Sequence, residues 1–410
     1  MGKRFFLLFL LTVFCLSAFC QLKRLGFEGK ASRIRFYNDT LFASSTAGIR
    51  SYDLNKRDGW QDYCFMGDTI RDFMKCGDTI VAATPREILI SHDKGVSFTQ
   101  LDLGGLRPNS NIFLQLIETM EQSNNNPQRM MVVLQSPTRE ISWLDRTFIG
   151  ISDDAGETWA WMCPFELRSH QGFERAKLAI DPIDDNHIFI YGKDYRYEGY
   201  KTIVMETFDS FQSSFWSYIP YGLYALYWEE YLSNIIFFTS YEEQFSRKII
   251  ANNPMNGILC MNDETRQWSY IQSEQYYLFD DIAAIGSTLY GLKLDANVQG
   301  GSLNVYESDD CGYSWKFLDS DFAVGSNMDD SWYFKGAEMN LRTAVCQGNI
   351  YVYRTEDIYE YTPSLNKITD ISNKEKLPDV FYNVGGQKIT HPQSGGIYIK
   401  NHRKVIKNTK

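Results

Sequence analysis

The sequence lacks the features that mark several functional classes. Its 410 residues carry a net charge of −10, and no block of basic residues occurs before the last ten positions. Nucleic-acid binding needs such a block, so nucleic acid is not an expected partner. Only five histidines occur, without ligand spacing, and there is no CxxC pair. We therefore expect no metal site and no cofactor.

Long apolar segments are also absent, apart from one at the N-terminus. Lys3 and Arg4 precede an apolar run from Phe5 to Phe14, and CLSAFCQ follows it. This order is typical of a secretory signal peptide, and the run is too short to span a bilayer comfortably. We expect residues 1–20 to be a signal peptide. The mature chain is then exported to the periplasm, the cell surface or the medium, without a transmembrane helix.

Two cleavage patterns compete. Cys20 is a candidate for lipid modification, although Phe19 stands where lipoprotein signals have a small residue. Ordinary cleavage after Cys20 leaves Gln21 at the N-terminus, and we favour this alternative.

Cysteines are sparse in the remaining chain. Export permits disulfides, but free buried thiols are an equally open alternative for six cysteines in so long a chain. Cys64 with Cys76 is the first pair to test. The six are Cys64, Cys76, Cys163, Cys260, Cys311 and Cys346.

One eight-residue pattern, Ser-x-Asp-x-Gly-x-(Ser/Thr)-aromatic, occurs three times, as SHDKGVSF, SDDAGETW and SDDCGYSW. We call each copy a box. Its aspartate can accept hydrogen bonds from the backbone of a turn, and its glycine permits a positive φ. The aromatic residue opens the next strand and can pack under the turn. The main box residues are Ser91, Asp93, Gly95, Phe98, Ser152, Asp154, Gly156, Trp159, Ser308, Asp310, Gly312 and Trp315.

Weaker copies lie between and before the clear boxes. TFDSFQSSFW keeps Thr207 and Asp209, MNDETRQW keeps Asp263, and SYDLNKRDGW keeps Asp53. The three clear boxes, these three weaker copies and the segment YEYTPSLNKI, which lacks box residues, mark seven units of roughly fifty residues. This period is typical of propeller blades.

Each unit contains several short runs of β-forming residues. In the second unit these are TIRDFMKC, TIVAAT, EILISHD and VSFTQLDL, separated by turn residues. No amphipathic helix of useful length is present. We predict an all-β fold over residues 21–372, a seven-bladed β-propeller of four-stranded antiparallel blades with each box between a third and a fourth strand.

The boxes resemble those of the Asp-box family, also called the bacterial neuraminidase repeat family. It includes sialidases, sortilin-type receptors, xyloglucan hydrolases and a photosystem assembly factor, all built on propellers. The resemblance implies that the boxes are folding elements away from the ligand face. Because this architecture serves many functions, the boxes alone do not indicate an activity.

Residues 373–410 form a separate C-terminal β tail. The segment from Val380 to Asn408 reads as a set of short strands. It resembles the tails of exported Bacteroidota proteins that are related to type IX secretion sorting domains, although it is shorter than a full sorting domain. The resemblance implies recognition by secretion machinery, and a structural end cap is the alternative. The matching residues are Tyr382, Asn383, Gly386, Gln387, Pro392, Gly396, Tyr398, Ile399, Asn401, Lys404 and Val405.

Evidence for catalysis is weak. The string nearest to the sialidase arginine motif is SRIRF, which lacks the aromatic residue before Arg33 and the proline, so Arg33 can equally be a solvated residue at a strand start. A glycoside hydrolase needs two carboxyl groups on either side of the scissile bond. Adjacent acids on a strand point in opposite directions, so none of the acidic pairs is ready-made for this role. These pairs are Asp280-Asp281, Glu229-Glu230 and Asp329-Asp330.

Three long loops of the third and fourth blades combine arginine with aromatic residues. Such side chains suit stacking on sugar rings or binding of acidic groups, although they can also simply pack the loops down. We expect them to lie on one sector of one face. The candidate ligand-binding residues are Arg139, Trp143, Arg168, His170, Tyr195, Arg196 and Tyr197.

The leading hypothesis is an exported, non-enzymatic β-propeller that binds a glycan or protein ligand on its loop face. A glycoside hydrolase of sialidase or xyloglucanase type is the alternative, and an assembly or scaffold factor is a second alternative. An enzyme is expected to show converging carboxylates or three arginines on one pocket wall. A binding protein is expected to show an aromatic and arginine groove without them.

Overall fold

The computed structural model of the chain contains two units, Met1–Thr362 and Pro363–Lys410. The last strand of the first unit ends at Tyr361. The described residues are 22–65, 67–85, 87–101, 116–135, 147–162, 173–194, 202–220, 232–239, 247–254, 256–272, 277–295, 302–322, 341–354, 357–363, 381–382, 388–389, 397–400 and 403–406.

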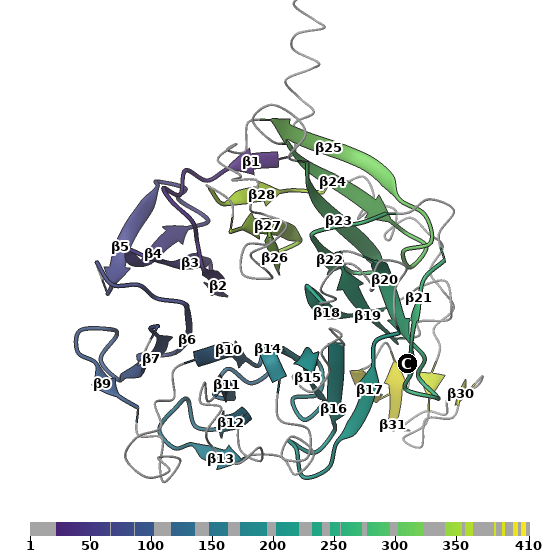
Figure 1. The fold of residues 1–410 in the computed structure, drawn as a ribbon, viewed down its shortest axis with the longest axis horizontal. Coiled ribbons are helices and arrows are strands. Elements are labelled where there is room, and N and C mark those ends of the chain that lie inside the picture. The colour runs from purple at the N-terminus through teal and green to yellow at the C-terminus, as the bar shows by residue number, and fades with distance from the viewer. Residues whose placement is uncertain are drawn as a thin grey trace, which may run out of the picture. The chain divides into compact units, whose positions relative to one another are not determined.

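The first unit is a ring of seven four-stranded antiparallel sheets, which confirms the predicted seven-bladed β-propeller (Figure 1). Blade 1 comprises β2 (Arg33–Tyr37), β3 (Thr40–Ser45), β4 (Gly48–Asp53) and β5 (Trp60–Cys64). Blade 2 comprises β6 (Asp72–Cys76), β7 (Thr79–Ala83), β8 (Ile88–Ser91) and β9 (Thr99–Gln100). Blade 3 comprises β10 (Leu116–Gln122), β11 (Met130–Gln135), β12 (Thr147–Ser152) and β13 (Ala160–Met162).

The remaining blades continue around the ring in sequence order. Blade 4 comprises β14 (Phe173–Ile180), β15 (Ile188–Asp194), β16 (Thr202–Thr207) and β17 (Phe215–Tyr218). Blade 5 comprises β18 (Asn234–Thr239), β19 (Arg247–Asn253), β20 (Gly257–Met261) and β21 (Trp268–Tyr270). Blade 6 comprises β22 (Asp281–Ile285), β23 (Thr288–Asp295), β24 (Ser302–Ser308) and β25 (Lys316–Phe322). Blade 7 comprises β26 (Arg342–Cys346), β27 (Asn349–Tyr353), β28 (Tyr359–Tyr361) and β1 (Leu22–Arg24).

The outer strand of blade 7 comes from the N-terminal end of the described chain. Leu22 pairs with Tyr361 and Arg24 with Tyr359, both antiparallel. The sequence analysis did not predict this strand, because β1 carries no box and pairs with β28, which is more than 300 residues away in the sequence. The pairing closes the ring, and each first strand contacts the first strands of both neighbouring blades.

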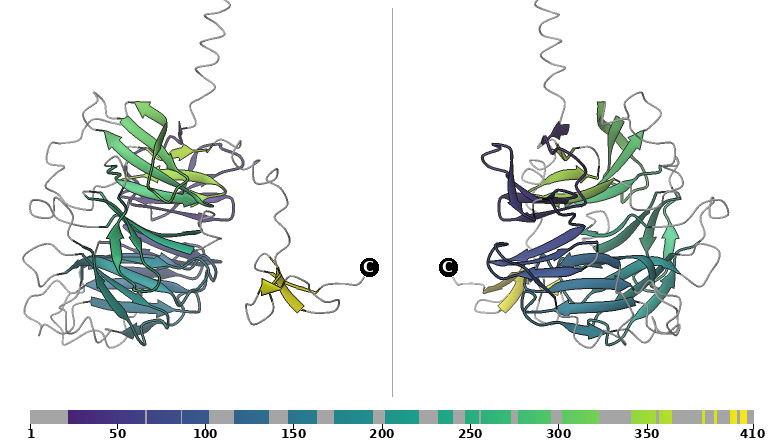
Figure 2. Two further views of the ribbon diagram at one scale, coloured as in Figure 1. Left: turned by 90° about the vertical axis from the view of Figure 1, so that its right-hand side faces the viewer. Right: turned by 60° about the vertical axis from the view of Figure 1, so that its left-hand side comes forward.

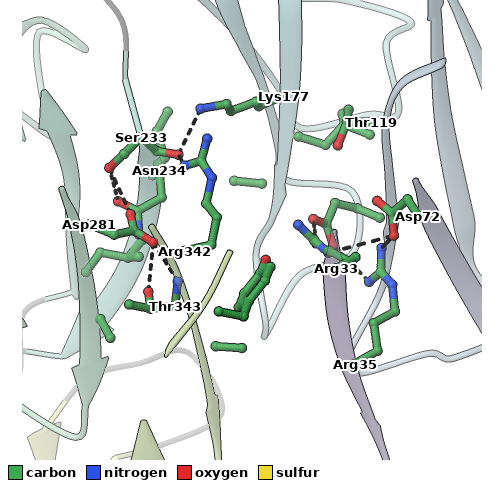
Figure 3. A pocket seen from close by; sticks show the side chains of 18 of the residues that line it. Arg33, Arg35, Asp72, Thr119, Lys177, Ser233, Asn234, Asp281, Arg342 and Thr343 are labelled. Carbon is green, nitrogen blue, oxygen red and sulfur yellow. Dashed lines mark hydrogen bonds and ion pairs between the residues drawn. The ribbon is translucent and has the colours of Figure 1, made fainter. Parts of the chain in front are cut away.

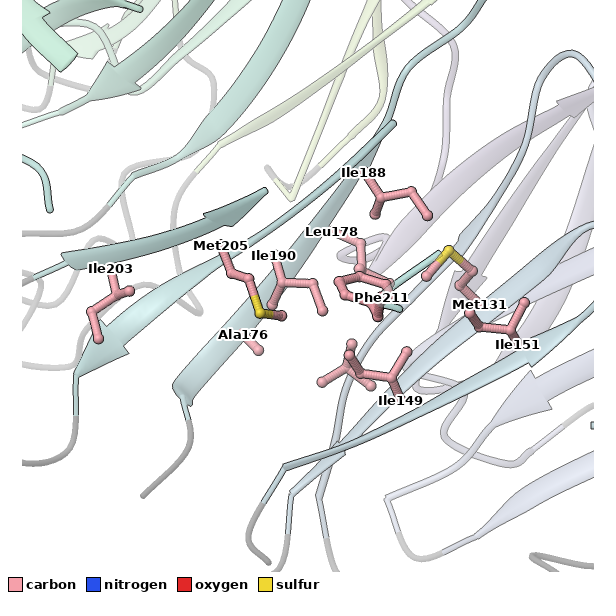
Figure 4. Packing of buried hydrophobic residues seen from close by; sticks show 11 residues of the cluster. Met131, Ile149, Ile151, Ala176, Leu178, Ile188, Ile190, Ile203, Met205 and Phe211 are labelled. Atoms are coloured by element: carbon pink, nitrogen blue, oxygen red, sulfur yellow. The ribbon is translucent and has the colours of Figure 1, made fainter. Parts of the chain in front are cut away.

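The apolar core is divided among the interfaces between blades. Seven clusters of buried side chains are found among the described residues, one at each blade-to-blade interface, including that of blade 7 with blade 1. Figure 4 shows the cluster in which Met131 and Ile149 of blade 3 meet Leu178 and Ile190 of blade 4. Seen from the side, neighbouring blades lie face against face (Figure 2).

Burial along each blade explains the composition of its strands. The second strand of blade 2, β7, is buried at every position because blades 1 and 3 cover its two faces. Its sequence is accordingly the apolar run TIVAA, whereas the outer strand β9 is exposed and polar. The strand β7 therefore reads as a continuous apolar run, without the alternation typical of a sheet that has one solvated face.

The box turns connect the third and fourth strands of blades 2, 3 and 6. In blade 3, Asp154 Oδ1 accepts a hydrogen bond from the Thr158 N–H at 2.9 Å, and Ser152 Oγ accepts one from the Gly156 N–H at 2.7 Å. Ala155 and Gly156 have φ of 60° and 91°, and the Trp159 indole donates to the Gly156 carbonyl. A side chain at Gly156 would meet the core of blade 2, so the turn itself packs on its neighbour.

Blade 4 keeps the same turn without the glycine. Thr207 Oγ1 accepts from the Phe211 N–H at 2.9 Å, and Asp209 Oδ1 accepts from the Ser213 N–H at 2.8 Å. Phe211 takes the glycine position with a φ of 69°, and its side chain packs into the core between blades 3 and 4. The hydrogen bonds and this packing hold a non-glycine residue in the left-handed region.

The cysteines of the described residues are free thiols. The Cys64–Cys76 pair, which the sequence analysis put first for testing, does not form. Cys64 packs into the core between blades 1 and 2, whereas Cys76 packs against the core between blades 2 and 3. The two thiols therefore lie on opposite faces of blade 2. Burial raises the pKa of the Cys64 thiol to about 12.

The second unit contains one four-stranded sheet in the order β30-β29-β31-β32. Its strands are β29 (Phe381–Tyr382), β30 (Lys388–Ile389), β31 (Ile397–Lys400) and β32 (Arg403–Ile406). In the part of the chain that the structure describes, no helix has the length and hydropathy needed to cross a membrane.

Candidate functional site: a central cavity lined by the first strands

A cavity of about 750 Å³ lies at the centre of the first unit. Its lining includes residues from the first strand of every blade, from β2 to β26. Among the described lining residues, seven are lysine or arginine and three are aspartate or glutamate, although the whole chain has a net charge of −10. The cavity is therefore cationic within an acidic protein. No box residue belongs to the described part of this lining.

One wall carries a compact group of two arginines and two carboxylates, which we call the paired cluster (Figure 3). Arg35 contacts Asp72 at 3.1 Å and Glu121 at 3.2 Å. Arg33 also pairs with Glu121, and its Nε lies 3.8 Å from Asp72 Oδ1. Each arginine thus meets both carboxylates, and the four charges sum to zero.

The paired cluster fixes the ionisation of Glu121. Burial by itself would raise the pKa of Glu121, but the charges of Arg33 and Arg35 hold it below its ordinary value. Glu121 is therefore a permanent carboxylate at neutral pH. Its hydrogen bonds and ion pairs give it the role of a fixed counter-charge, because a general acid must keep its proton near the working pH.

The facing wall is built from blades 5, 6 and 7 (Figure 3). Asp281, which is 1% exposed, accepts hydrogen bonds from Ser233 Oγ at 2.8 Å, the Thr343 N–H at 2.8 Å and Thr343 Oγ1 at 2.9 Å. Asn234 donates from its side chain to the Ile282 carbonyl. These contacts connect the first strands β18, β22 and β26 and hold this wall in one arrangement.

Two cations converge beside Asp281. Arg342 donates to the Ser233 carbonyl, and Lys177 Nζ lies 3.2 Å from the same oxygen and 2.8 Å from the Leu232 carbonyl. Arg342 is 8% exposed. We call Arg342, Lys177 and the Ser233 carbonyl the cationic wall.

The sequence-based site predictions have different outcomes. Arg33 is at a strand start, as expected, but it lies in the cavity lining as an ion-paired residue. Asp280 and Asp281 do point apart, since Asp280 accepts from the Leu294 N–H while Asp281 faces Ser233. Two groups lie outside the described residues. These are the acidic pairs Glu229-Glu230 and Asp329-Asp330, and the loop residues Arg139, Trp143, Arg168, His170, Tyr195, Arg196 and Tyr197.

Most residues of the cavity were missed by sequence reasoning. A signal for them does exist, because five of the seven first strands open with a polar residue. The five are Arg33, Asp72, Asn234, Asp281 and Arg342. A charged or amide side chain at the start of an otherwise apolar inner strand is costly unless it meets a partner, so its recurrence blade after blade indicates a common polar centre.

A second cluster of buried charges lies outside the cavity, between blades 4 and 5. His187 Nδ1 lies 2.8 Å from Asp181, and its Nε2 lies 2.7 Å from Glu206. Arg266 donates from Nε to Glu206 at 2.9 Å, and the Phe208 ring stacks on His187. Because Arg266 of blade 5 contacts Glu206 of blade 4, which also contacts His187, the cluster has a structural role in joining the two blades. Among the described residues, no three His, Cys, Asp or Glu side chains are grouped to hold a metal ion.

Comparison with known proteins supports the fold. No protein-family model and no curated protein matches the chain. Among solved structures, an ancestral GH74 enzyme is similar over 91% of this chain and 49% of its own, at 11% identity and a TM-score of 0.51. A GH74 enzyme of Niastella koreensis is similar over 72% of this chain and 46% of its own, at 12% identity and a TM-score of 0.45.

A further similar structure is an extracellular domain from B. thetaiotaomicron, part of a protein described as a hybrid two component system. It is similar over 93% of this chain and 46% of its own, at 13% identity and a TM-score of 0.48. The chain thus spans about half the length of these solved structures. At 11% identity, the likeness to the ancestral GH74 enzyme concerns the fold alone.

Proposed function

We propose that the protein is an exported β-propeller of the Asp-box class that binds a glycan in its central cavity without cleaving it. The observation that carries the proposal is the convergence of hydroxyl, amide and cationic side chains from the first strands on a cavity of about 750 Å³. Ligand sites are typically concave, with a few placed polar groups in an otherwise apolar lining. Thr119, Asn234 and Thr343 supply groups that suit sugar hydroxyls.

Binding is favoured over hydrolysis by the state of the carboxylates in the cavity. Asp72 and Glu121 are ion-paired with the same two arginines, and Asp281 accepts three hydrogen bonds. A glycoside hydrolase needs one carboxyl group that is protonated and poised beside the bond to be cleaved. All three carboxyl groups are thus already engaged by protein partners, which supports a role in recognition. A glycoside hydrolase is the alternative function.

We propose that the arginine and aromatic residues of the loops in blades 3 and 4, which lie outside the described residues, extend this site. A cavity of this volume holds only part of an oligosaccharide, so the rest of a chain ligand needs a second surface. Trp143 and Tyr195 are proposed to stack on sugar rings there.

Export belongs to the same proposal and rests on the signal-peptide pattern of residues 1–20 and on the tail resemblance. Mass spectrometry of the secreted protein is expected to give an unmodified N-terminus at Gln21. A diacylated Cys20 would instead make the protein membrane-anchored.

The test of function uses a glycan array probed with the mature protein and two matched variants. Thr119→Tyr fills the cavity from β10, whereas Thr99→Tyr adds the same ring to the exposed outer strand β9. We expect the wild type and Thr99→Tyr to retain glycans and Thr119→Tyr to retain none, with similar melting temperatures for the two variants. Equal binding by Thr119→Tyr would place the ligand outside the cavity.

The array ligands are then incubated with the wild type and examined by mass spectrometry for shorter products. Unchanged ligands are the expected result. Release of a sugar fragment would show that the protein is a glycoside hydrolase, the alternative function. If no glycan on the array is bound but peptides of a library are, the ligand is a protein.

A further inference from the structure

The turns between the third and fourth strands of blades 1 and 5 share a structure that is not the box. In blade 1, Asp53 Oδ1 accepts two backbone hydrogen bonds of the turn at 2.9 Å, and the Asp53 carbonyl accepts one from the Arg57 N–H. In blade 5, Asn262 Oδ1 accepts two at 3.0 and 2.8 Å, and the Asn262 carbonyl accepts one from the Arg266 N–H. Arg57 and Arg266 have φ of 54° and 53°, so both turns place an arginine in the same left-handed conformation.

Each of these arginines contacts a glutamate of the preceding blade. Arg57 donates from Nη1 and Nη2 to the two carboxylate oxygens of Glu360 in β28 of blade 7, at 2.7 and 3.0 Å. Arg266 donates from Nε to Glu206 in β16 of blade 4, at 2.9 Å. Both glutamates are 2% exposed. At these two interfaces, one blade therefore buries a carboxylate and the next blade supplies a cation for it.

The box interfaces use apolar contacts at the same strand position. Glu206 and Glu360 each stand one residue before the end of a third strand, and in β8 of blade 2 this position is Ile90. A Cβ atom on Gly156, in the box turn of blade 3, would lie 3.2 Å from Ile90. A buried glutamate facing a box turn would lack its arginine, which is costly. Each kind of turn thus fits one kind of preceding blade.

Glu360 lies where the ring closes. It is the middle residue of β28 and is paired in register with Lys23 of β1. Its carboxylate also accepts from Tyr351 Oη at 3.0 Å and from Asn349 Nδ2 at 3.1 Å. Burial by itself would raise the pKa of Glu360, but the hydrogen bonds from Arg57 and Tyr351 hold it below its ordinary value. Glu360 is therefore a carboxylate at neutral pH.

We propose that Arg57 is a latch that keeps the ring closed by neutralising Glu360, and that Arg266 is a second latch that holds blade 5 against blade 4 through Glu206. Removing one partner of a buried ion pair is strongly destabilising, because the other charge stays buried without compensation. The effect of losing Arg57 falls first on β1, which pairs with β28 over only three residues. We therefore expect β1 and β28 to open locally while the other blades stay folded.

Hydrogen–deuterium exchange followed by mass spectrometry tests the two latches at neutral pH. It is measured on the wild type, Arg57→Gln, Arg266→Gln and Lys56→Gln. Lys56 lies in the same turn as Arg57, but its side chain is exposed and pairs with Asp53, so Lys56→Gln is the matched control. Peptides that cover β1 and β28 report on the first latch and peptides that cover β16 on the second. The buried strand β7 of blade 2 is the internal reference.

We expect Arg57→Gln to raise the exchange rate of β1 and β28 by about tenfold or more and that of β7 and β16 by less than about twofold. Arg266→Gln is expected to show the reverse pattern, with faster exchange in β16 and none in β1 and β28. Lys56→Gln is expected to match the wild type. Should Arg57→Gln fail to fold, Arg57→Lys carries the same test, because lysine keeps the charge but loses the paired hydrogen bonds.

A second pair of variants asks whether Arg57 acts through Glu360. Glu360→Gln removes the buried charge, so adding Arg57→Gln to it is expected to change the exchange of β1 and β28 by less than about twofold. A tenfold rise in this background as well would show that Arg57 holds the strand in another way, and would overturn the latch.

Two further outcomes contradict the proposal. Unchanged exchange of β1 and β28 in Arg57→Gln would show that the ring stays closed without the ion pair. An equal rise in every blade, β7 included, would show that Arg57 contributes only to overall stability. Unchanged exchange of β16 in Arg266→Gln would overturn the second latch alone.

Discussion

Leu22 and Tyr361 are paired across β1 and β28, so the N-terminal strand of the described chain completes the last blade of the ring. Both side chains are buried in the core between blades 6 and 7. The propeller is therefore closed by an antiparallel pair between the first and last strands of its described residues. Asp319 of blade 6 accepts a hydrogen bond from the Leu22 N–H.

This closure predicts a sensitive site at the first strand of the described chain. Leu22→Ala is expected to lower the free energy of unfolding by about 2 to 3 kcal/mol, since it removes a buried leucine side chain from a core. Lys23→Ala, at an exposed position of the same strand, is the control and is expected to cost under about 0.5 kcal/mol. Thermal unfolding followed by circular dichroism measures both. Equal melting temperatures for Leu22→Ala and wild type would show that β1 does not hold the ring closed.

The boxes are expected to contribute stability without contributing to binding. Asp154→Ala and Asp310→Ala each remove acceptors for a backbone N–H and a side-chain hydroxyl, so each is expected to cost on the order of 1 kcal/mol. Glu157→Ala is the control, because Glu157 is an exposed residue of the blade 3 turn and its partner His92 is exposed as well. Denaturant titration and glycan binding are measured side by side. Loss of binding by either box variant at unchanged stability would assign the boxes to the ligand site.

Asp280 gives a defined pH dependence. Burial raises its pKa from 3.8 to about 6, although the hydrogen bond from the Leu294 N–H acts to lower the pKa. Because the folded-state pKa is the higher one, the folded state binds the proton more tightly. Protonation therefore favours folding below pH 4, and this contribution is lost as the pH rises through about 6.

Asp280→Asn tests this dependence, because asparagine can accept the same hydrogen bond without a charge. The variant is expected to be more stable than wild type by about 1 to 2 kcal/mol at pH 7.5, with allowance for its partial exposure, and the difference is expected to shrink toward pH 4.5. Urea unfolding at pH 4.5, 6.0 and 7.5 measures it. A difference that grows toward low pH would contradict the assignment.

The loop residues of blades 3 and 4 stay a prediction. Trp143→Ala and Tyr195→Ala are each expected to weaken glycan binding by about 1 to 3 kcal/mol and to leave the melting temperature unchanged, as for aromatic anchors at a binding surface. Tyr313→Ala removes an exposed aromatic ring from the box turn of blade 6 and is the control. Calorimetric affinities that do not change in either loop variant would restrict the site to the cavity.

The fold could be predicted from sequence because its repeating signal is local. Each box stabilises its turn through hydrogen bonds between residues four positions apart, such as Asp154 with Thr158. The eight-residue pattern therefore predicts the same hairpin wherever it occurs. Even the copy that lost its glycine keeps this geometry at Thr207 and Asp209. The spacing of these turns and the apolar runs between them then specify the number of blades.

Only the tertiary structure decided what the centre of the ring contains. Arg33 forms an ion pair with Glu121 two blades away, and Arg342 donates a hydrogen bond to the Ser233 carbonyl of blade 5. Leu22 pairs with Tyr361 in the antiparallel sheet of blade 7. None of these pairs has a sequence spacing that any local rule connects. A side chain at the start of an inner strand acquires its partners only when the ring closes and brings all seven first strands around one cavity, because charge pairing depends on distance in space and not along the chain.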